Sequence, residues 1–228
     1  MTWLYQNPVE AASRILDEIF NVLEGSKSYC LSENDLHRIK YLSKTNMYTL
    51  DKLPEKLYLK NQNSDIVGVF EEIIKSPQVI DAIPIMVKGE MSFLNPVVIL
   101  PSDCSSPKDV WVITHELVHL LSVGPYIHVK HSPDLWLHSF GLNSYGYSQS
   151  GGECITVFQK EKNILNEIFN DAVTWHMVEA ILGSTVEPPD VVVKKYSHDI
   201  KNRNDINFLI GCYFSGQSEK IIKRISIK

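Results

Sequence analysis

The segment His115-Glu116-Leu117-Val118-His119 has the pattern H-E-x-x-H, and no other feature constrains this chain as strongly. Two histidines four residues apart on a helix project from the same face, one above the other. Imidazoles at that spacing can bind one zinc ion, and the glutamate beside the first histidine can act as a general base on a water molecule. The pattern therefore predicts that His115 and His119 are metal ligands and that Glu116 is a catalytic base.

Helix signals surround this pattern. Ser106 stands at an N-cap position, Pro107 at the first helical position, and Asp109 can complete a capping box. Apolar residues then recur at helical spacing until Gly124 and Pro125 end the segment. We expect the apolar side of this helix to face the core and the H-E-x-x-H side to face a cleft. The alternative is a helix with ordinary histidines and a solvated glutamate.

The third ligand has to come from elsewhere in the chain. Catalytic zinc usually has three protein ligands, but the pattern with a third histidine fails because Ser122 and Pro125 occupy its glycine and histidine positions. A second helix is predicted over residues 163–183, and Glu167 and Asp171 share one face of it. A glutamate among apolar neighbours needs a partner such as zinc, so we expect Glu167 to be a ligand. Asp171 could then accept a hydrogen bond from a ligand histidine. In the alternative, both acids lie on the solvent edge of an amphipathic helix.

An H-E-x-x-H helix followed by a second helix with N-E-x-x-x-D resembles the gluzincins, the thermolysin-like zinc metallopeptidases. The resemblance covers about residues 95–182, and the longer separation of His119 from Glu167 indicates a small, divergent member. It implies a zincin-like fold and one zinc ion per chain, held by the three ligands named above. It also implies that the motif glutamate activates water, that the later aspartate supports a histidine, and that the substrate is a peptide or protein.

Members of that family often stabilise the developing oxyanion with a tyrosine or histidine. Tyr145 and Tyr147 precede the helix that carries Glu167, whereas Tyr196 and His198 follow it. We select Tyr196, because the gluzincin pattern often places such a residue after the third-ligand helix. The other three residues stay open as candidates.

Several further residues could bind a metal. His128, His131 and His138 lie in a segment rich in turn formers, residues 124–139, which we expect to be a loop with exposed or substrate-facing histidines. Glu153 follows a glycine pair and has no helical partner, so it ranks below the glutamate of the second helix as a ligand.

Two other functions compete with a peptidase. In a non-catalytic, zinc-stabilised protein-binding module, a fourth protein ligand such as His128 or Cys154 would close the metal site. In a metal-free α+β interaction protein, the H-E-x-x-H pattern would be accidental. The metal content distinguishes the metal-free interaction protein from the other two. The coordination number distinguishes the zinc-stabilised module from the peptidase.

The pattern of elements predicts an α+β fold, with a small sheet over the H-E-x-x-H helix and helices before and after it. Besides the two helices above, helices are predicted at 8–25, 32–44, 63–75, 205–214 and 218–225, strands at 85–88 and 97–100, and a hairpin at 146–158. The strand at 97–100 is either an exposed edge that binds peptide backbone or a buried central strand. We expect a mainly helical part at 1–90 and a metallopeptidase domain at 91–228, or one continuous domain.

Composition and targeting signals limit the partners and the cellular location that we expect for this protein. The 228 residues are 44% hydrophobic with a net charge of −5, which suits one sizeable domain or two small ones and gives no support for nucleic acid binding. No signal peptide or membrane span is apparent, so we expect a cytoplasmic protein without membrane partners, with leaderless export or delivery into another cell still open. The four cysteines are widely spaced, which favours free thiols. The sequence does not set the oligomeric state.

Overall fold

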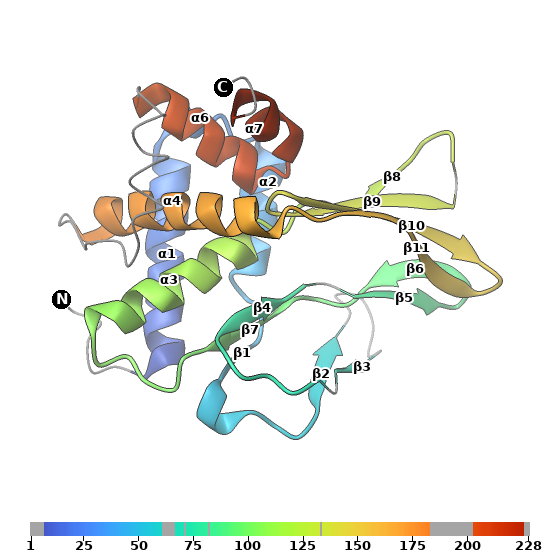
Figure 1. Cartoon of the computed structure of the whole chain (residues 1–228), viewed down its shortest axis with the longest axis horizontal. Helices are drawn as coiled ribbons and strands as arrows, with labels where there is room; N and C mark the ends of the chain where they lie inside the picture. The colour runs from blue at the N-terminus through green and yellow to red at the C-terminus, as the bar shows by residue number, and fades with distance from the viewer. Residues whose placement is uncertain are drawn as a thin grey trace.

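The computed structural model describes residues 7–60, 67–70, 72–81, 83–132, 134–182 and 203–225. These residues form a mixture of helices and small sheets, which confirms the expected α+β class (Figure 1). The described helices are α1 (Pro8–Gly25), α2 (Glu33–Leu42), α3 (Pro107–Leu121), α4 (Asn163–Leu182), α6 (Arg203–Phe214) and α7 (Ser218–Ile225).

The strands form two small sheets and two ribbons. The first sheet has the order β1-β7-β4, from β1 (Met47–Thr49), β7 (Val97–Leu100) and β4 (Gln78–Ile80). The second has the order β11-β10-β9-β8, from β8 (Ile127–His128), β9 (Leu135–Phe140), β10 (Asn143–Ser150) and β11 (Glu153–Lys160). The ribbons pair β2 (Leu57–Lys60) with β3 (Val67–Phe70), and β5 (Pro84–Val87) with β6 (Glu90–Phe93).

The main core lies among the helices. In Figure 1, α3 and α4 cross the molecule side by side, α1 passes behind both, and α6 and α7 lie beyond α4. Fully buried residues of α1, including Ala11, Ile15 and Ile19, belong to the same apolar cluster as Leu117 of α3 and Val173 of α4. The first 90 residues therefore share a core with the rest of the chain, and through β1 and β4 they also share a sheet with β7. A division near residue 90 stays a prediction.

Local capping explains where the first helices begin. The Asn7 side chain accepts a hydrogen bond from the Val9 amide, and Pro8 opens α1 as expected. Ser32 and Asp35 form a reciprocal capping box at the start of α2. The predicted helices near 205–214 and 218–225 are also present, as α6 and α7.

The helix predicted at 63–75 is wrong. Residues 67–70 form β3, which pairs antiparallel with β2, and residues 72–75 are not helical. Val67 and Val69 favour strands because they are β-branched, and Gly68 weakens a helix. On β2, Leu57 and Leu59 are buried while the residues between and after them are exposed, so this strand buries one apolar face.

Two other expectations are settled by the sheets. The strand at 97–100 is central, because β1 pairs with β7 in parallel on one side and β4 pairs with it in antiparallel fashion on the other. All four of its residues are buried, so its interpretation as an exposed edge is wrong. The loop expected at 124–139 is wrong in part, because β8 and most of β9 lie within it.

The predicted hairpin is present as β10 and β11. Its two turn residues, Gly151 and Gly152, have φ angles of 57° and 86°, the left-handed values that a tight hairpin turn requires and glycine adopts without strain. No helix in the described part of the chain is long and apolar enough to cross a membrane. The four cysteines are free thiols.

Candidate metal centre

Helix α3 begins where the sequence predicts. The Ser106 hydroxyl accepts a hydrogen bond from the Asp109 amide, and Asp109 Oδ2 accepts one from the Ser106 amide at 2.8 Å. This capping box and Pro107 fix the first turn of the helix. Leu117 and Val118, on the apolar side of α3, are fully buried. His115 and His119 lie on another side of α3, which faces Glu167 and Asp171 of α4.

Three ligand atoms converge between α3 and α4. The His115 and His119 Nε2 atoms lie 3.1 Å apart, and each lies 3.3 Å from Glu167 Oε2. A tetrahedral zinc ion with bonds of about 2.0–2.1 Å holds its ligand atoms about 3.3–3.4 Å apart. The spacing of the three atoms therefore fits three corners of a zinc tetrahedron, and we call His115, His119 and Glu167 the ligand cluster.

The hydrogen bond between His115 and Asp171 also bears on metal binding. Its Nδ1 lies 2.8 Å from Asp171 Oδ1, and a carboxylate can only accept a hydrogen bond. In the neutral imidazole, Nδ1 therefore carries the proton and Nε2 presents a lone pair to Glu167 and His119. In this tautomer, His115 Nε2 can bind a cation together with Glu167 Oε2. A carboxylate behind a ligand histidine is the usual support for such a metal site.

Burial and hydrogen bonds shift the pKa values of all three cluster residues. Burial lowers the pKa of His115, but hydrogen bonds to Asp171 and Glu167 outweigh burial and raise this pKa to about 10. Burial raises the pKa of Glu167, but its hydrogen bonds to the two histidines hold that pKa well below its usual range. Burial lowers the pKa of His119 despite its hydrogen bond to Glu167. Without a metal, a proton on His115 supplies the positive charge that Glu167 and Asp171 require.

Glu116 lies beside the cluster on α3 and is itself buried, with 7% of its surface exposed. Burial raises the pKa of Glu116 to about 7, with the Glu167 carboxylate adding to the rise and His115 opposing it. A carboxyl group in this position differs from the solvated glutamate of the alternative interpretation.

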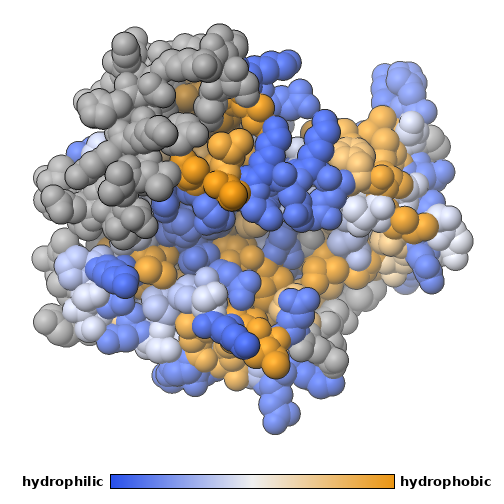
Figure 2. Space-filling model, viewed as in Figure 1, coloured by the Kyte–Doolittle hydropathy of each residue, from blue (hydrophilic) through white to orange (hydrophobic). Residues whose placement is uncertain are grey.

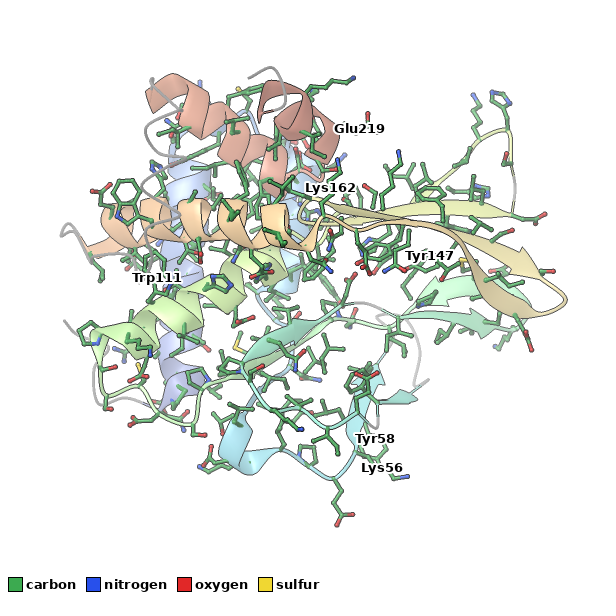
Figure 3. All side chains as sticks on the ribbon, viewed as in Figure 1. Lys56, Tyr58, Trp111, Tyr147, Lys162 and Glu219 are labelled. Carbon is green, nitrogen blue, oxygen red and sulfur yellow. The ribbon has the colours of Figure 1, made fainter. Side chains whose placement is uncertain are left out.

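One side of the cluster is open to solvent. The Glu167 side chain is 55% exposed, whereas those of His115 and His119 are 17% and 8% exposed. Figure 2 shows hydrophilic residues gathered across the middle of the face, at the height of α3 and α4. In Figure 3, Trp111 marks α3 and Lys162 marks the residue just before α4. Water can therefore reach the cluster from the side of Glu167.

Within the described ranges, the ligand cluster is the single group of three or more potential ligands that could hold a metal ion. His128 and His131 are exposed, and Glu153 is exposed beside the hairpin turn, so none of them joins it. His138 is different from the exposed or substrate-facing residue that we expected. It is buried, and its Nε2 lies 3.2 Å from both carboxylate oxygens of Asp81.

The oxyanion candidates fall into two groups. Tyr196 and His198 lie outside the described residues. Tyr145 and Tyr147 are neighbours on one face of β10, with rings stacked at 6.2 Å. Tyr147 is 7% exposed and points from β10 toward the β5–β6 ribbon, where it meets Phe93 (Figure 3). Tyr147 is therefore part of an aromatic core, and Tyr196 stays a prediction.

One residue near the cluster was not anticipated from the sequence. Asn170, fully buried on α4, donates a hydrogen bond from Nδ2 to the backbone carbonyl of His115 at 3.0 Å. Asn163, Asn166 and Asn170 recur at helical spacing within an otherwise apolar helix. Buried amides need partners, so this stripe was the available signal for a polar contact on a second face of α4.

Comparison of the chain with models of protein families, with curated proteins and with solved structures found no match.

Proposed function

We propose that this chain is a zinc-dependent metallopeptidase of the gluzincin type, with a zincin-like arrangement of α3 and α4. The observation that carries the proposal is the ligand cluster, in which three potential ligand atoms lie at the edge lengths of a zinc tetrahedron, with Asp171 behind His115. Two imidazoles and one carboxylate form a ligand set that zinc favours, and three protein ligands leave a fourth position for water.

The chain would use the centre to hydrolyse a peptide bond in a peptide or protein. A bound zinc ion supplies a Lewis acid that polarises water and the substrate carbonyl. Glu116 takes a proton from the attacking water as the new carbon–oxygen bond forms. The same carboxyl group then gives this proton to the leaving nitrogen as the carbon–nitrogen bond breaks. Tyr196 is our proposed donor to the oxyanion.

The first test is the amount of bound zinc per chain. We expect about one zinc ion in the native protein and a sharp loss in the Glu167→Ala variant, because a ligand is gone. Glu179→Ala is the matched control, since Glu179 lies on α4 outside the cluster. Zinc retained by Glu167→Ala would make a histidine or Cys154 the third ligand and refute the gluzincin assignment. No zinc uptake by the native protein on titration would favour an interaction protein.

The second test separates catalysis from metal binding. Glu116→Gln keeps the size and hydrogen-bonding capacity of the side chain but removes the base. We expect this variant to bind zinc as the native protein does and to lose turnover of a peptide library that the native protein cleaves. Cleavage at the native rate by this variant would refute the mechanism. Zinc binding without any cleavage by the native protein would favour the non-catalytic, zinc-stabilised binding module.

A further inference from the structure

A fully buried tyrosine on α6 meets the polar face of α4. The Tyr213 hydroxyl lies 3.0 Å from Asn170 Oδ1 and 3.4 Å from Asn166 Oδ1. Burial raises the pKa of Tyr213, so its hydroxyl keeps its proton and can donate a hydrogen bond. Its ring packs against Phe169 and Phe214, with centroids 5.2 and 5.8 Å away. The ring position is thus held by apolar contacts that do not depend on the hydroxyl.

The hydroxyl fixes the orientation of Asn170. The His115 carbonyl can only accept a hydrogen bond, so the NH₂ group of Asn170 faces it, at 3.0 Å. The amide oxygen then faces Tyr213, which donates to it. The chain of hydrogen bonds runs from α6 through α4 to the backbone of the first ligand histidine on α3.

The other histidine has its own support within α3. Ser122 is fully buried at the end of this helix. Its hydroxyl donates to the His119 carbonyl at 2.7 Å. Side chains therefore bind the backbone carbonyls of both histidines, and that of His115 is linked to Tyr213 through Asn170.

A second branch from the Tyr213 hydroxyl reaches Asn166, the residue before Glu167. Asn166 Oδ1 accepts a hydrogen bond from the Leu142 amide at 2.8 Å as well as facing Tyr213. Asn166 directly precedes Glu167 on α4. Its contacts therefore hold together the start of α4, the turn between β9 and β10, and α6. Two of the three cluster residues, His115 and Glu167, thus stand next to an asparagine that contacts Tyr213.

We propose that Tyr213 is a positioning residue for the metal centre, and that its hydroxyl holds α3 and α4 at the separation at which the three ligand atoms converge. The inference rests on the proposed metal site. Loss of the hydroxyl leaves Asn170 Oδ1 without its donor, so the amide can turn away from the His115 carbonyl. The two imidazoles would then be free to move apart. This movement would lower the affinity for metal but would leave the packing of the apolar core unchanged.

The test compares Tyr213→Phe with Tyr29→Phe. Tyr29 is the matched control because it is also buried and its hydroxyl also meets α4, at His176 Nε2, 3.3 Å away and outside the ligand cluster. Zinc affinity is measured by competition with a chromophoric chelator, and the visible spectrum of the Co²⁺-loaded protein reports on ligand geometry. Unfolding of the metal-free proteins in urea gives the structural cost of each change.

For Tyr213→Phe we expect zinc affinity to fall about tenfold to a hundredfold, the scale on which outer-shell partners act. We also expect an altered Co²⁺ spectrum at saturating metal, with native affinity and spectrum in Tyr29→Phe. Native affinity and spectrum in a folded Tyr213→Phe variant would overturn the inference and leave the metal site intact. If Tyr213→Phe does not fold, Asn170→Ala answers the question, because it removes the side chain that links the Tyr213 hydroxyl to the His115 carbonyl. A native protein that binds no zinc would overturn both proposals.

Discussion

Gly141, in the turn between β9 and β10, is the position where a single methyl group should disturb the surroundings of the metal centre most directly. Its φ angle is 56°, in the left-handed region. A Cβ atom added there would lie 2.0 Å from Asn166 Oδ1 and 2.9 Å from the Tyr213 hydroxyl oxygen. Both atoms belong to the buried network beside the ligands, so neither can move without breaking a hydrogen bond.

Two contributions determine how much Gly141→Ala should lower the free energy of unfolding. A left-handed conformation costs a non-glycine residue about 1–2 kcal/mol. The Asn166 side chain must also leave its place, and the buried Leu142 amide then loses its acceptor, at about 1–3 kcal/mol. We therefore expect Gly141→Ala to lower the free energy of unfolding by about 2–5 kcal/mol.

Gly151→Ala supplies the control. Gly151 has a φ angle of 57°, nearly the same as that of Gly141, but an added Cβ atom would meet nothing within 4 Å. This variant should lose only the backbone contribution of about 1–2 kcal/mol. Urea unfolding of both variants without metal, with the native m-value, gives the difference. Equal losses in the two variants would refute the description of a tightly packed network at Asn166.

Three further predictions concern the same helices. Asp171→Asn should lower zinc affinity about tenfold to a hundredfold in chelator competition, and unchanged affinity would remove Asp171 from the site. Free zinc at one hundred times its dissociation constant should raise the free energy of unfolding of the native protein by about 2.7 kcal/mol. The same concentration of zinc should leave the free energy of unfolding of Glu167→Ala unchanged. An equal rise in the native protein and in this variant would show that zinc binds elsewhere in the chain. Asp109→Ala should lower the free energy of unfolding by about 1 kcal/mol in urea titrations, through loss of the α3 capping box, and native stability would indicate that this cap is not formed in solution.

The parts of the site that depend on local chain geometry could be predicted from the sequence. Helical periodicity places His115 and His119 on one face, and the capping residues determine where α3 starts. The pairing of that face with Glu167, many residues later, is a tertiary contact. Its prediction rested on the cost of burying a glutamate among apolar neighbours, and the resemblance of the second helix to a known pattern supported it.

Where tertiary contacts decide between two local outcomes, the sequence was a weaker guide. Residues 67–70 form a strand because β2 offers them a partner, and 97–100 are central because β1 and β4 pair on both sides. Strand pairing between separate segments has no local signature beyond β-branched composition. The buried state of His138 has the same origin, because its partner Asp81 follows a strand of the other sheet.

The sequence of α4 nevertheless contains a second polar pattern besides Glu167 and Asp171. Glu167 and Asp171 form one polar row, and Asn166 and Asn170, each one residue earlier, form a second row rotated by about 100° around the helix. The acidic row faces the histidines of α3, and the amide row faces the His115 carbonyl, the Leu142 amide and α6. A rotation of α4 that improved either row would break the other, and each broken contact would leave a buried polar group unpaired. The two rows together thus determine the rotation of α4, which is why Glu167 reaches the two histidines in the structure.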